Sequence, residues 1–253
     1  MQRELHLVAL PGIPEIERGA ALRDLLLAAA ERASMALHAG DILVLAQKII
    51  SKAEGRSVQL AGVTPSAHAQ DLARKAGKDP RIVELMLRES RKVLRVKPGV
   101  IIVEHKLGFV MANAGIDQSN VPGGEDAVLL LPEDPDASAR KLREELHAAT
   151  GVDVGVLIID SFGRAWRNGV TGTAIGVAGI AALIDMRGNK DREGRTLKVT
   201  QVAAADELAA AASLVMGQAD EGTPAVLVRG FPYARRESSV KELLRPEAED
   251  LFR

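Results

Sequence analysis

Short apolar runs alternate with longer amphipathic segments along this chain of 253 residues. The runs stop at glycine, proline or aspartate, which favour turns, so they are typical of buried strands. They predict strands at residues 6–10, 42–46, 100–103, 109–112, 154–159 and 225–228. The segment at residues 197–202 leads into the last predicted helix of the core.

Apolar side chains recur at helical spacing in the longer segments. Leu22, Leu25 and Leu26, for example, fall on one face of a helix. These segments predict helices at residues 17–33, 65–76, 80–94, 136–149 and 205–216, and a surface helix in the charged tail, residues 235–253. Strands and helices alternate without a linker, which predicts a mixed α/β fold in one compact unit. The stretch 108–124 is a candidate second lobe inserted between core elements.

Composition excludes several classes of protein. Hydrophobic residues make up 47% of the chain, which is enough for a buried core. The formal net charge is -1 and aromatic residues are 2%, so we expect no nucleic-acid partner. Cysteine is absent, which excludes disulfides and fits a reducing cytoplasm. No apolar run reaches the roughly 20 residues that span a bilayer, and the polar N-terminus does not begin a secretory signal, so we expect a soluble protein without a membrane partner.

Polar residues are concentrated in two segments, residues 113–120 and 158–169. In the second, the predicted strand ends at Asp160-Ser161, and a carboxylate at a strand end is held firmly enough to ligate a cation. Ser161 could complete an oxygen-rich shell of the kind that Mg²⁺ or Mn²⁺ prefers. In the first segment, Asp117 and Asn120 either join this site or form local turns. The arginines that follow Ser161 can face an anion, so the sequence indicates a metal–phosphate site.

The common nucleotide-binding signatures are missing, both the P-loop and the glycine pattern of the Rossmann fold. Residues 172–179 are rich in glycine but spaced for neither, and we interpret them as small residues that let elements pack closely. Residues 10–14 form either a turn or a backbone cradle for a nucleotide. Residues 47–52, with two lysines after a buried strand, are either solvated or placed for a polyphosphate.

Together these motifs resemble the GTP-dependent γ-glutamyl ligase family that acts on coenzyme F420-0. The segments that carry the resemblance occur in one order, at residues 10–14, 40–56, 114–121, 160–169, 199–207 and 228–231. The resemblance therefore extends over nearly the whole chain. It implies an unusual two-lobed ligase fold with mixed and antiparallel sheets, neither P-loop nor Rossmann. It also implies a single domain of residues 1–253, in which the two lobes are interleaved.

The resemblance implies a reaction as well. GTP would phosphorylate a carboxylate of F420-0, and the amine of L-glutamate would attack the acyl phosphate and leave an amide. Relatives can repeat the step and add γ-linked glutamates. A homodimer is expected from the resemblance alone. Some relatives carry a C-terminal flavin-binding domain, and from the length of 253 residues we expect none here.

By the same resemblance, individual residues acquire roles. Asp117 and Asp160 would hold a first divalent ion, and Ser161 and Gln201 a second, with K⁺ as a further candidate. The residues expected to contact GTP are Leu10, Pro11, Gly12, Ile13, Gln47, Lys52 and Asn120, with Gln47 and Lys52 on its polyphosphate side. The chain departs from relatives at Gln47, Ser161 and Gln201, where Ser, Thr and Glu also occur. Gln is a neutral and weaker ligand, and this departure bears on the second ion.

Arg164 and Arg167 are the candidate catalytic residues. Their spacing of three would place them on one side if the loop turned helically after Gly163, where one could orient the acceptor carboxylate. A surface ion pair is the alternative. We expect Trp166, the single tryptophan, to be a half-buried packing residue. Two other functions stay open at this stage, a metal-dependent nucleotide phosphohydrolase and a non-catalytic nucleotide-binding module.

Overall fold

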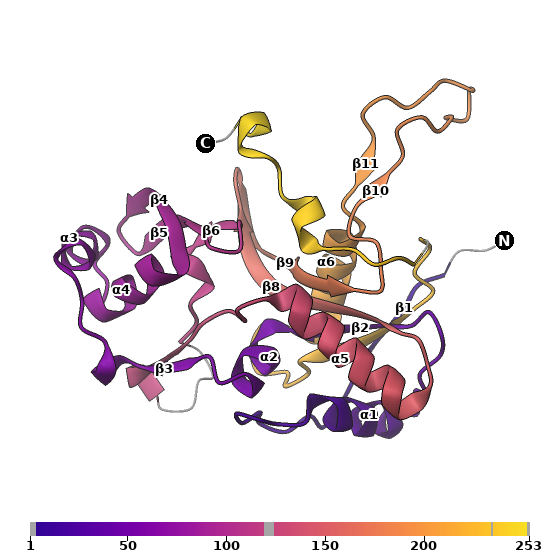
Figure 1. Ribbon diagram of the computed structural model, residues 1–253, viewed down its shortest axis with the longest axis horizontal. Helices are drawn as coiled ribbons and strands as arrows, with labels where there is room; N and C mark the ends of the chain where they lie inside the picture. Colours follow the sequence, from indigo (N-terminus) through magenta and orange to yellow (C-terminus); the bar gives the residue numbers. More distant parts are fainter. Residues whose placement is uncertain (1–3, 119–123, 234, 252–253) are drawn as a thin grey trace.

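A computed structural model describes residues 4–118, 124–233 and 235–251. Its centre is a five-stranded mixed sheet in the order β1-β12-β2-β8-β9 (Figure 1). The strands are β1 (His6–Ala9), β2 (Ile42–Ala46), β8 (Gly155–Arg164), β9 (Arg167–Ala178) and β12 (Ala225–Arg229). Only β2 and β8 run parallel, and the other neighbours are antiparallel. Because β2 and β8 are buried by layers on both faces, they read as continuous apolar runs.

Two helices cover opposite faces of this sheet, α5 (Pro135–Thr150) in front and α6 (Ala204–Met216) behind (Figure 1). Glycines in β9 allow both contacts. A Cβ atom on Gly172 would lie 2.3 Å from the carbonyl oxygen of Ala209 in α6. One on Gly176 would lie 2.5 Å from the backbone of Pro135 in α5. The interpretation of residues 172–179 as packing glycines is therefore confirmed. A third helix, α1 (Leu22–Arg32), packs beside α5.

Residues 57–118 and 124–130 form a small lobe with a hydrophobic cluster of its own, and we call the rest of the described chain the large lobe. In the small lobe, α3 (Ala67–Ala76) and α4 (Pro80–Glu89) lie beside a three-stranded antiparallel sheet of β4 (Ser90–Lys97), β5 (Val100–His105) and β6 (Val110–Ala112). A short ladder pairs β3 (Ser57–Gln59) with β7 (Ala127–Leu129). The ring of Phe109 meets that of Phe162 edge to face at 5.8 Å, so the two lobes share apolar contacts. The mixed α/β fold with mixed and antiparallel sheets is confirmed.

Several predicted elements differ from the structure. The helix predicted at residues 80–94 ends at Glu89, and residues 90–94 belong to β4, because the turn at Pro98-Gly99 folds β4 onto β5. Residues 47–53 form helix α2 (Gln47–Ala53), which the sequence analysis missed. The tail was predicted as a helix, but its described part, residues 235–251, contains only two 3₁₀ turns, η4 (Val240–Leu243) and η5 (Glu247–Glu249). The other 3₁₀ turns are η1 (Leu60–Gly62), η2 (Asn113–Gly115) and η3 (Gly124–Asp126).

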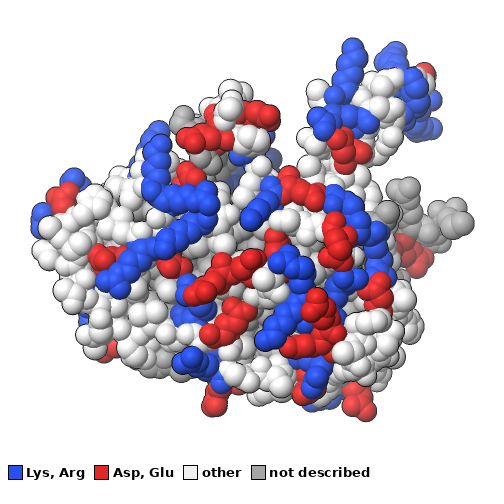
Figure 2. Space-filling view, viewed as in Figure 1, with Lys and Arg blue, Asp and Glu red and all other residues white. Residues whose placement is uncertain are grey.

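A long hairpin built on β10 (Ile184–Asp185) and β11 (Gln201–Val202) projects from the body (Figure 1). Figure 2 shows that Lys and Arg dominate its outer part, whereas both signs of charge are interspersed over the body on this face. The basic residues of this hairpin are Arg187, Lys190, Arg192, Arg195 and Lys198. In the described part of the chain, no helix has the length and apolar character needed to cross a membrane.

Candidate active site

A cavity of about 700 Å³ lies where the large lobe meets the small lobe. The parallel register pairs Ala46 with Ile159, so β2 and β8 reach the same edge of the sheet together. The residues that follow two neighbouring parallel strands lie side by side at the carboxyl ends of those strands. Open α/β sheets commonly bind their ligands at this edge. The cavity is lined by residues from five segments: 13–16, 46–52, 111–117, 159–163 and 216–224.

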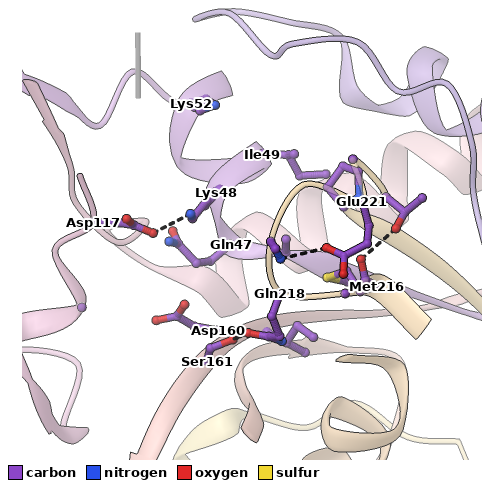
Figure 3. A pocket seen from close by; sticks show the side chains of 18 of the residues that line it. Gln47, Lys48, Ile49, Lys52, Asp117, Asp160, Ser161, Met216, Gln218 and Glu221 are labelled. Atoms are coloured by element: carbon purple, nitrogen blue, oxygen red, sulfur yellow. Dashed lines mark hydrogen bonds and ion pairs between the residues drawn. The ribbon is translucent and has the colours of Figure 1, made fainter. Parts of the chain in front are cut away.

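Asp160 forms the wall of the cavity on the large lobe (Figure 3). It does not end its strand as predicted, because β8 continues to Arg164 and pairs Asp160 with Thr173 of β9. The backbone around Asp160 is therefore fixed on both sides by the sheet. The carboxylate is partly buried and accepts a hydrogen bond from the backbone N–H of Ser161. A strand interior holds a ligand more precisely than a loop end does.

Asp117 forms the opposite wall, on the small lobe. It follows a turn in which Asn113, Ala114 and Gly115 all have positive φ values, of 53°, 54° and 65°. Asn113 stabilises the turn, because its side-chain oxygen accepts the N–H of Ile101. Beyond the turn, the backbone of Asp117 exchanges two hydrogen bonds with Leu129. Its carboxylate forms an ion pair with Lys48 of α2 at 2.6 Å (Figure 3).

The two carboxylates differ in their electrostatics. The pKa of Asp160 is raised to about 6, chiefly by burial and also by the negative charge of Asp117, while the N–H of Ser161 and the charge of Lys48 oppose the rise. Among the described residues, no Lys or Arg lies within ion-pair distance of Asp160, whereas Asp117 is paired directly. A carboxylate in this state is stabilised by any cation that enters the cavity.

Gln47 lies between these walls in Figure 3 and is almost completely buried. One turn further along α2, Ser51 donates a hydrogen bond of 2.8 Å to the side-chain oxygen of Gln47. This bond fixes the orientation of the amide, and its Nε2 donor is left without a protein partner. A buried donor without a partner is costly unless a ligand or water accepts from it.

Lys52 also lines the cavity, with a side chain that is only 9% exposed. Its ammonium group forms an ion pair with Glu15, which comes from the segment that follows β1. That segment contributes Ile13 to the cavity as well. Gln47, Lys52, Asp117, Asp160, Ser161 and Ile13 are thus the predicted residues that the structure brings together.

A loop between α6 and β12, residues 216–224, closes one side of the cavity, and the sequence analysis missed it. Ser161 donates a hydrogen bond of 2.7 Å to the side-chain oxygen of Gln218 in this loop (Figure 3). The loop is held internally, because Thr223 bonds the carbonyl of Met216 at 2.7 Å and Glu221 accepts the N–H of Ala219. A signal was present in the sequence. Gly217, Gly222 and Pro224 enclose several polar residues immediately before a buried strand.

Other predicted residues lie away from the cavity. Leu10 is fully buried in the core, and the carbonyl groups of Pro11 and Gly12 accept hydrogen bonds from Arg32. Gln201 is exposed at the base of the projecting hairpin, opposite Asp185. None of these four is among the lining residues, and Asn120 lies outside the described part of the chain.

Arg164 and Arg167 are exposed and pair with each other across the β8–β9 hairpin, so the expected helical turn after Gly163 is wrong. Pairing between β8 and β9 continues as far as Arg164 and Arg167, and this pairing keeps the chain extended where a helical turn was expected. Trp166 is 90% exposed, which makes the expectation of a half-buried residue wrong too.

The donors in the cavity fit a hard divalent cation. In the described part of the chain, no three His, Cys, Asp or Glu side chains gather closely enough to hold a metal by themselves. Two carboxylates, a hydroxyl and an amide oxygen are nevertheless the oxygen ligands that Mg²⁺ and Mn²⁺ accept, and these ions usually bind through one or two carboxylates plus phosphate and water. The pKa of Asp160 is raised chiefly by burial, so a cation beside this carboxylate would stabilise its charged form. The lining carboxylates, Glu15, Asp117, Asp160, Asp220 and Glu221, also outnumber the lining cations, Lys48 and Lys52.

The chain matches a known protein family, and members of that family, over most of its length. The profile of the F420-0:gamma-glutamyl ligase family matches residues 12–230. A coenzyme F420:L-glutamate ligase from Methanothermobacter thermautotrophicus is 47% identical over 251 residues, which cover 98% of this chain and 99% of that protein. Proteins with the same name from Methanopyrus kandleri and Methanocaldococcus jannaschii are 50% and 48% identical, and the matches cover 87% and 85% of this chain and 88% and 85% of those proteins. The chain belongs to the F420-0:γ-glutamyl ligase family, a family of ligases.

Proposed function

We propose that this chain joins L-glutamate to coenzyme F420-0 at the expense of GTP, by way of an acyl phosphate, in the biosynthesis of coenzyme F420. The observation that carries the proposal is the cavity between the lobes. There, Asp117 and Asp160 face the same space as Lys48 and Lys52, in a chain of this family. A site that combines carboxylates with lysines suits the handling of phosphate through a divalent cation.

The residues of the cavity fall into two groups, those that would bind cations and those that would bind the phosphates of GTP. Asp117 and Asp160 would hold a divalent cation, Mg²⁺ or Mn²⁺, whose chemistry is to neutralise phosphate oxygens during transfer. Ser161 and Gln218 offer oxygens for a second ion, and we propose Gln218 in the role that the sequence analysis gave to Gln201, because Gln218 contacts Ser161. Lys52 and the Nε2 donor of Gln47 would bind the polyphosphate of GTP.

The same residues position the reacting groups. Phosphoryl transfer is carried mainly by orientation and by neutralisation of charge, and the protein does both by holding the γ-phosphate against the acceptor carboxylate. A recessed cavity also limits the access of water, which would hydrolyse an acyl phosphate before the amine of glutamate attacked it. Arg164 and Arg167 lie beyond the cavity on the same hairpin as Asp160, and we propose that they contact anionic groups of the acceptor.

Further proposals follow from the family and await their own tests. These are the addition of further γ-linked glutamates, a K⁺ ion beside the divalent ions, contact of Asn120 with the nucleotide, and a homodimer.

The proposed function is tested by measuring the mass of the reaction product. Purified protein is incubated with F420-0, GTP, L-glutamate and Mg²⁺ or Mn²⁺, and we expect the acceptor to gain one or more glutamyl units. Release of phosphate from GTP should require both F420-0 and glutamate. Phosphate release that is independent of both, without a mass increase, would instead identify a nucleotide phosphohydrolase. Binding of GTP without turnover would identify a binding module.

A further inference from the structure

The pairing of β8 with β9 is irregular directly beside Asp160. One step along β8, from Ile158 to Ile159, is matched by two steps along β9, from Gly176 to Ala174, which makes a β-bulge in β9. Asp160 is the next residue of β8. A bulge bends its strand and increases the local twist, and bulges beside active sites change the direction of neighbouring side chains. The β9 bulge therefore helps to set the direction in which the Asp160 carboxylate points.

Two helix carboxylates hold β9, one on each side of the bulge. Asp206, in the first turn of α6, accepts the N–H of Ala174 at 3.0 Å. Asp136, in the first turn of α5, accepts the N–H of Val177 at 2.8 Å. It also accepts the hydroxyl of Ser239 at 2.6 Å. Because α5 and α6 lie on opposite faces of the sheet (Figure 1), the bulged segment is held from both faces.

The positions of these two N–H groups match the bulged form of the strand and not a regular one. β9 is the edge strand next to β8. The N–H groups of a regular strand alternate between its two edges, so residues three apart point theirs in opposite directions. Ala174 and Val177 are three apart, yet the N–H of each donates to a helix carboxylate. The extra residue of the bulge brings both groups to the outer edge, and the two carboxylates therefore favour the bulged register.

The charge on Asp206 exceeds what is needed to cap the edge of a sheet. Burial raises its pKa, and the N–H of Ala174 opposes the rise. Among the described residues, no Lys or Arg pairs with this partly buried carboxylate, so its charge is held at a cost. An amide oxygen would accept the same N–H without that cost, but a charged acceptor makes a bond roughly twice as strong. The stronger bond suits a strand that must keep its position when a divalent cation binds beside it.

We propose that Asp206 and Asp136 are positioning residues, which hold the β9 bulge and through it direct the Asp160 carboxylate at the divalent cation. The inference rests on the proposed function, in which Asp160 is a ligand of that cation. Neither Asp206 nor Asp136 lines the cavity, so neither would touch the cation or a substrate. Groups that orient a metal ligand typically change metal affinity by about 10- to 100-fold. A purely structural role would instead lower the stability of the fold and leave the metal affinity of the folded protein unchanged.

Binding of Mn²⁺ to the purified protein, without GTP or acceptor, separates these roles. The free ion is measured by electron paramagnetic resonance. Asp206→Ala and Asp136→Ala should each weaken Mn²⁺ binding about tenfold or more. Asp206→Asn, which keeps an acceptor oxygen for Ala174, should recover part of the loss. Asp134→Ala is the matched control, because Asp134 accepts a backbone N–H at the start of the same helix α5, that of Ala137 at 2.9 Å, and makes no bond to β9. It should bind Mn²⁺ as the wild-type protein does.

Three outcomes would overturn the inference. The first is unchanged Mn²⁺ affinity in folded Asp206→Ala, which would leave the proposed function intact if the wild-type protein still adds glutamate to F420-0. The second is equal weakening in Asp134→Ala, which would show that the loss follows from general destabilisation. The third is wild-type Mn²⁺ binding that Asp160→Asn does not weaken, which would place the cation elsewhere. If Asp136→Ala fails to fold because Ser239 loses its partner, the Asp206 variants decide the question by themselves.

Discussion

Each wall of the cavity carries an aspartate, but the two aspartates differ in how their backbone is held and in whether their charge is paired. Asp160 belongs to the large lobe, where β8 and β9 fix its backbone and burial raises its pKa to about 6. Asp117 belongs to the small lobe, where a strained turn presents it and Lys48 neutralises it at 2.6 Å. One wall is rigid and short of positive charge, and the other is already paired. The difference indicates that an incoming cation gains most at Asp160 and must compete with Lys48 at Asp117.

The largest effect should come from removing either charge. Asp160→Asn and Asp117→Asn keep the shape of the side chain and remove its charge, and each should lower the rate of ligation at least about a thousandfold, because a lost charged ligand removes several kcal/mol of transition-state stabilisation. The readout is the rate of glutamyl addition at saturating divalent cation.

Asp71→Asn is the control for this pair, since Asp71 is an exposed carboxylate on α3 that pairs with Lys75. It should ligate at the wild-type rate. Turnover near the wild-type rate in Asp160→Asn or in Asp117→Asn would place the reaction elsewhere in the molecule.

Stability as a function of pH should separate the two walls. The folded-state pKa of Asp160, about 6, lies above the usual value of 3.8, so the ionised carboxylate opposes folding. This cost is fully present above pH 6, declines as the pH falls from about 6 to 4, and vanishes below that range. Without divalent cation, Asp160→Asn should therefore raise the free energy of unfolding at pH 8 by roughly 2 to 3 kcal/mol, and by little at pH 4. Denaturant titration at the two pH values measures this.

Asp117→Asn should behave differently in the same titration. It breaks a partly exposed ion pair, so its effect on the free energy of unfolding should be about 1 kcal/mol or less. It should also lower the pKa of Asp160, because the charge of Asp117 raises that pKa. Equal stabilisation by the two variants at pH 8 would show that the walls do not differ in the way described.

A smaller effect is expected at Lys52, which serves the phosphate side of the cavity rather than either wall. Lys52→Ala should raise the KM for GTP about tenfold and that for glutamate little, because a hydrogen bond to a charged group contributes roughly 1.5–3 kcal/mol. Glu15→Gln is the matched variant. It removes the carboxylate that pairs with Lys52 and should leave the KM for GTP equal or lower. Equal increases in the KM of both substrates in Lys52→Ala would assign Lys52 a purely structural role.

The core of the fold could be predicted from the sequence, because the spacing of apolar residues in each of its elements fits only a strand or only a helix. The apolar run at residues 42–46 is β2, and the helix predicted at residues 205–216 agrees closely with α6. Elements whose secondary structure depends on contacts with distant parts of the chain could not be predicted in this way. The stretch 90–94 continues the apolar spacing of α4, and only pairing with β5 makes it a strand. The tail is held by contacts such as that of Ser239 with Asp136 at 2.6 Å, which no local pattern indicates.

The site was predictable where polar residues follow a strand, and less so where the small lobe or a distant loop supplies them. Asp160 and Ser161 lie in β8 directly after its apolar run, Lys52 lies in α2 soon after β2, and all three line the cavity. Gln218 is 57 residues from its partner Ser161, so only the folded chain brings the two together. Gln201 and Gln218 are both glutamines near the ends of α6, and the sequence offered no means of choosing between them.

The proposed reaction depends on transfer of phosphate from GTP to a carboxylate held in this cavity. It is tested most directly with F420-0 whose carboxylate oxygens are labelled with ¹⁸O, followed by mass spectrometry of the phosphate released during ligation. An acyl phosphate predicts that each released phosphate carries one labelled oxygen and that the new amide keeps the other. Unlabelled phosphate, with an acceptor that keeps both labelled oxygens and gains no glutamate, would contradict the claim and identify water as the group that attacks GTP.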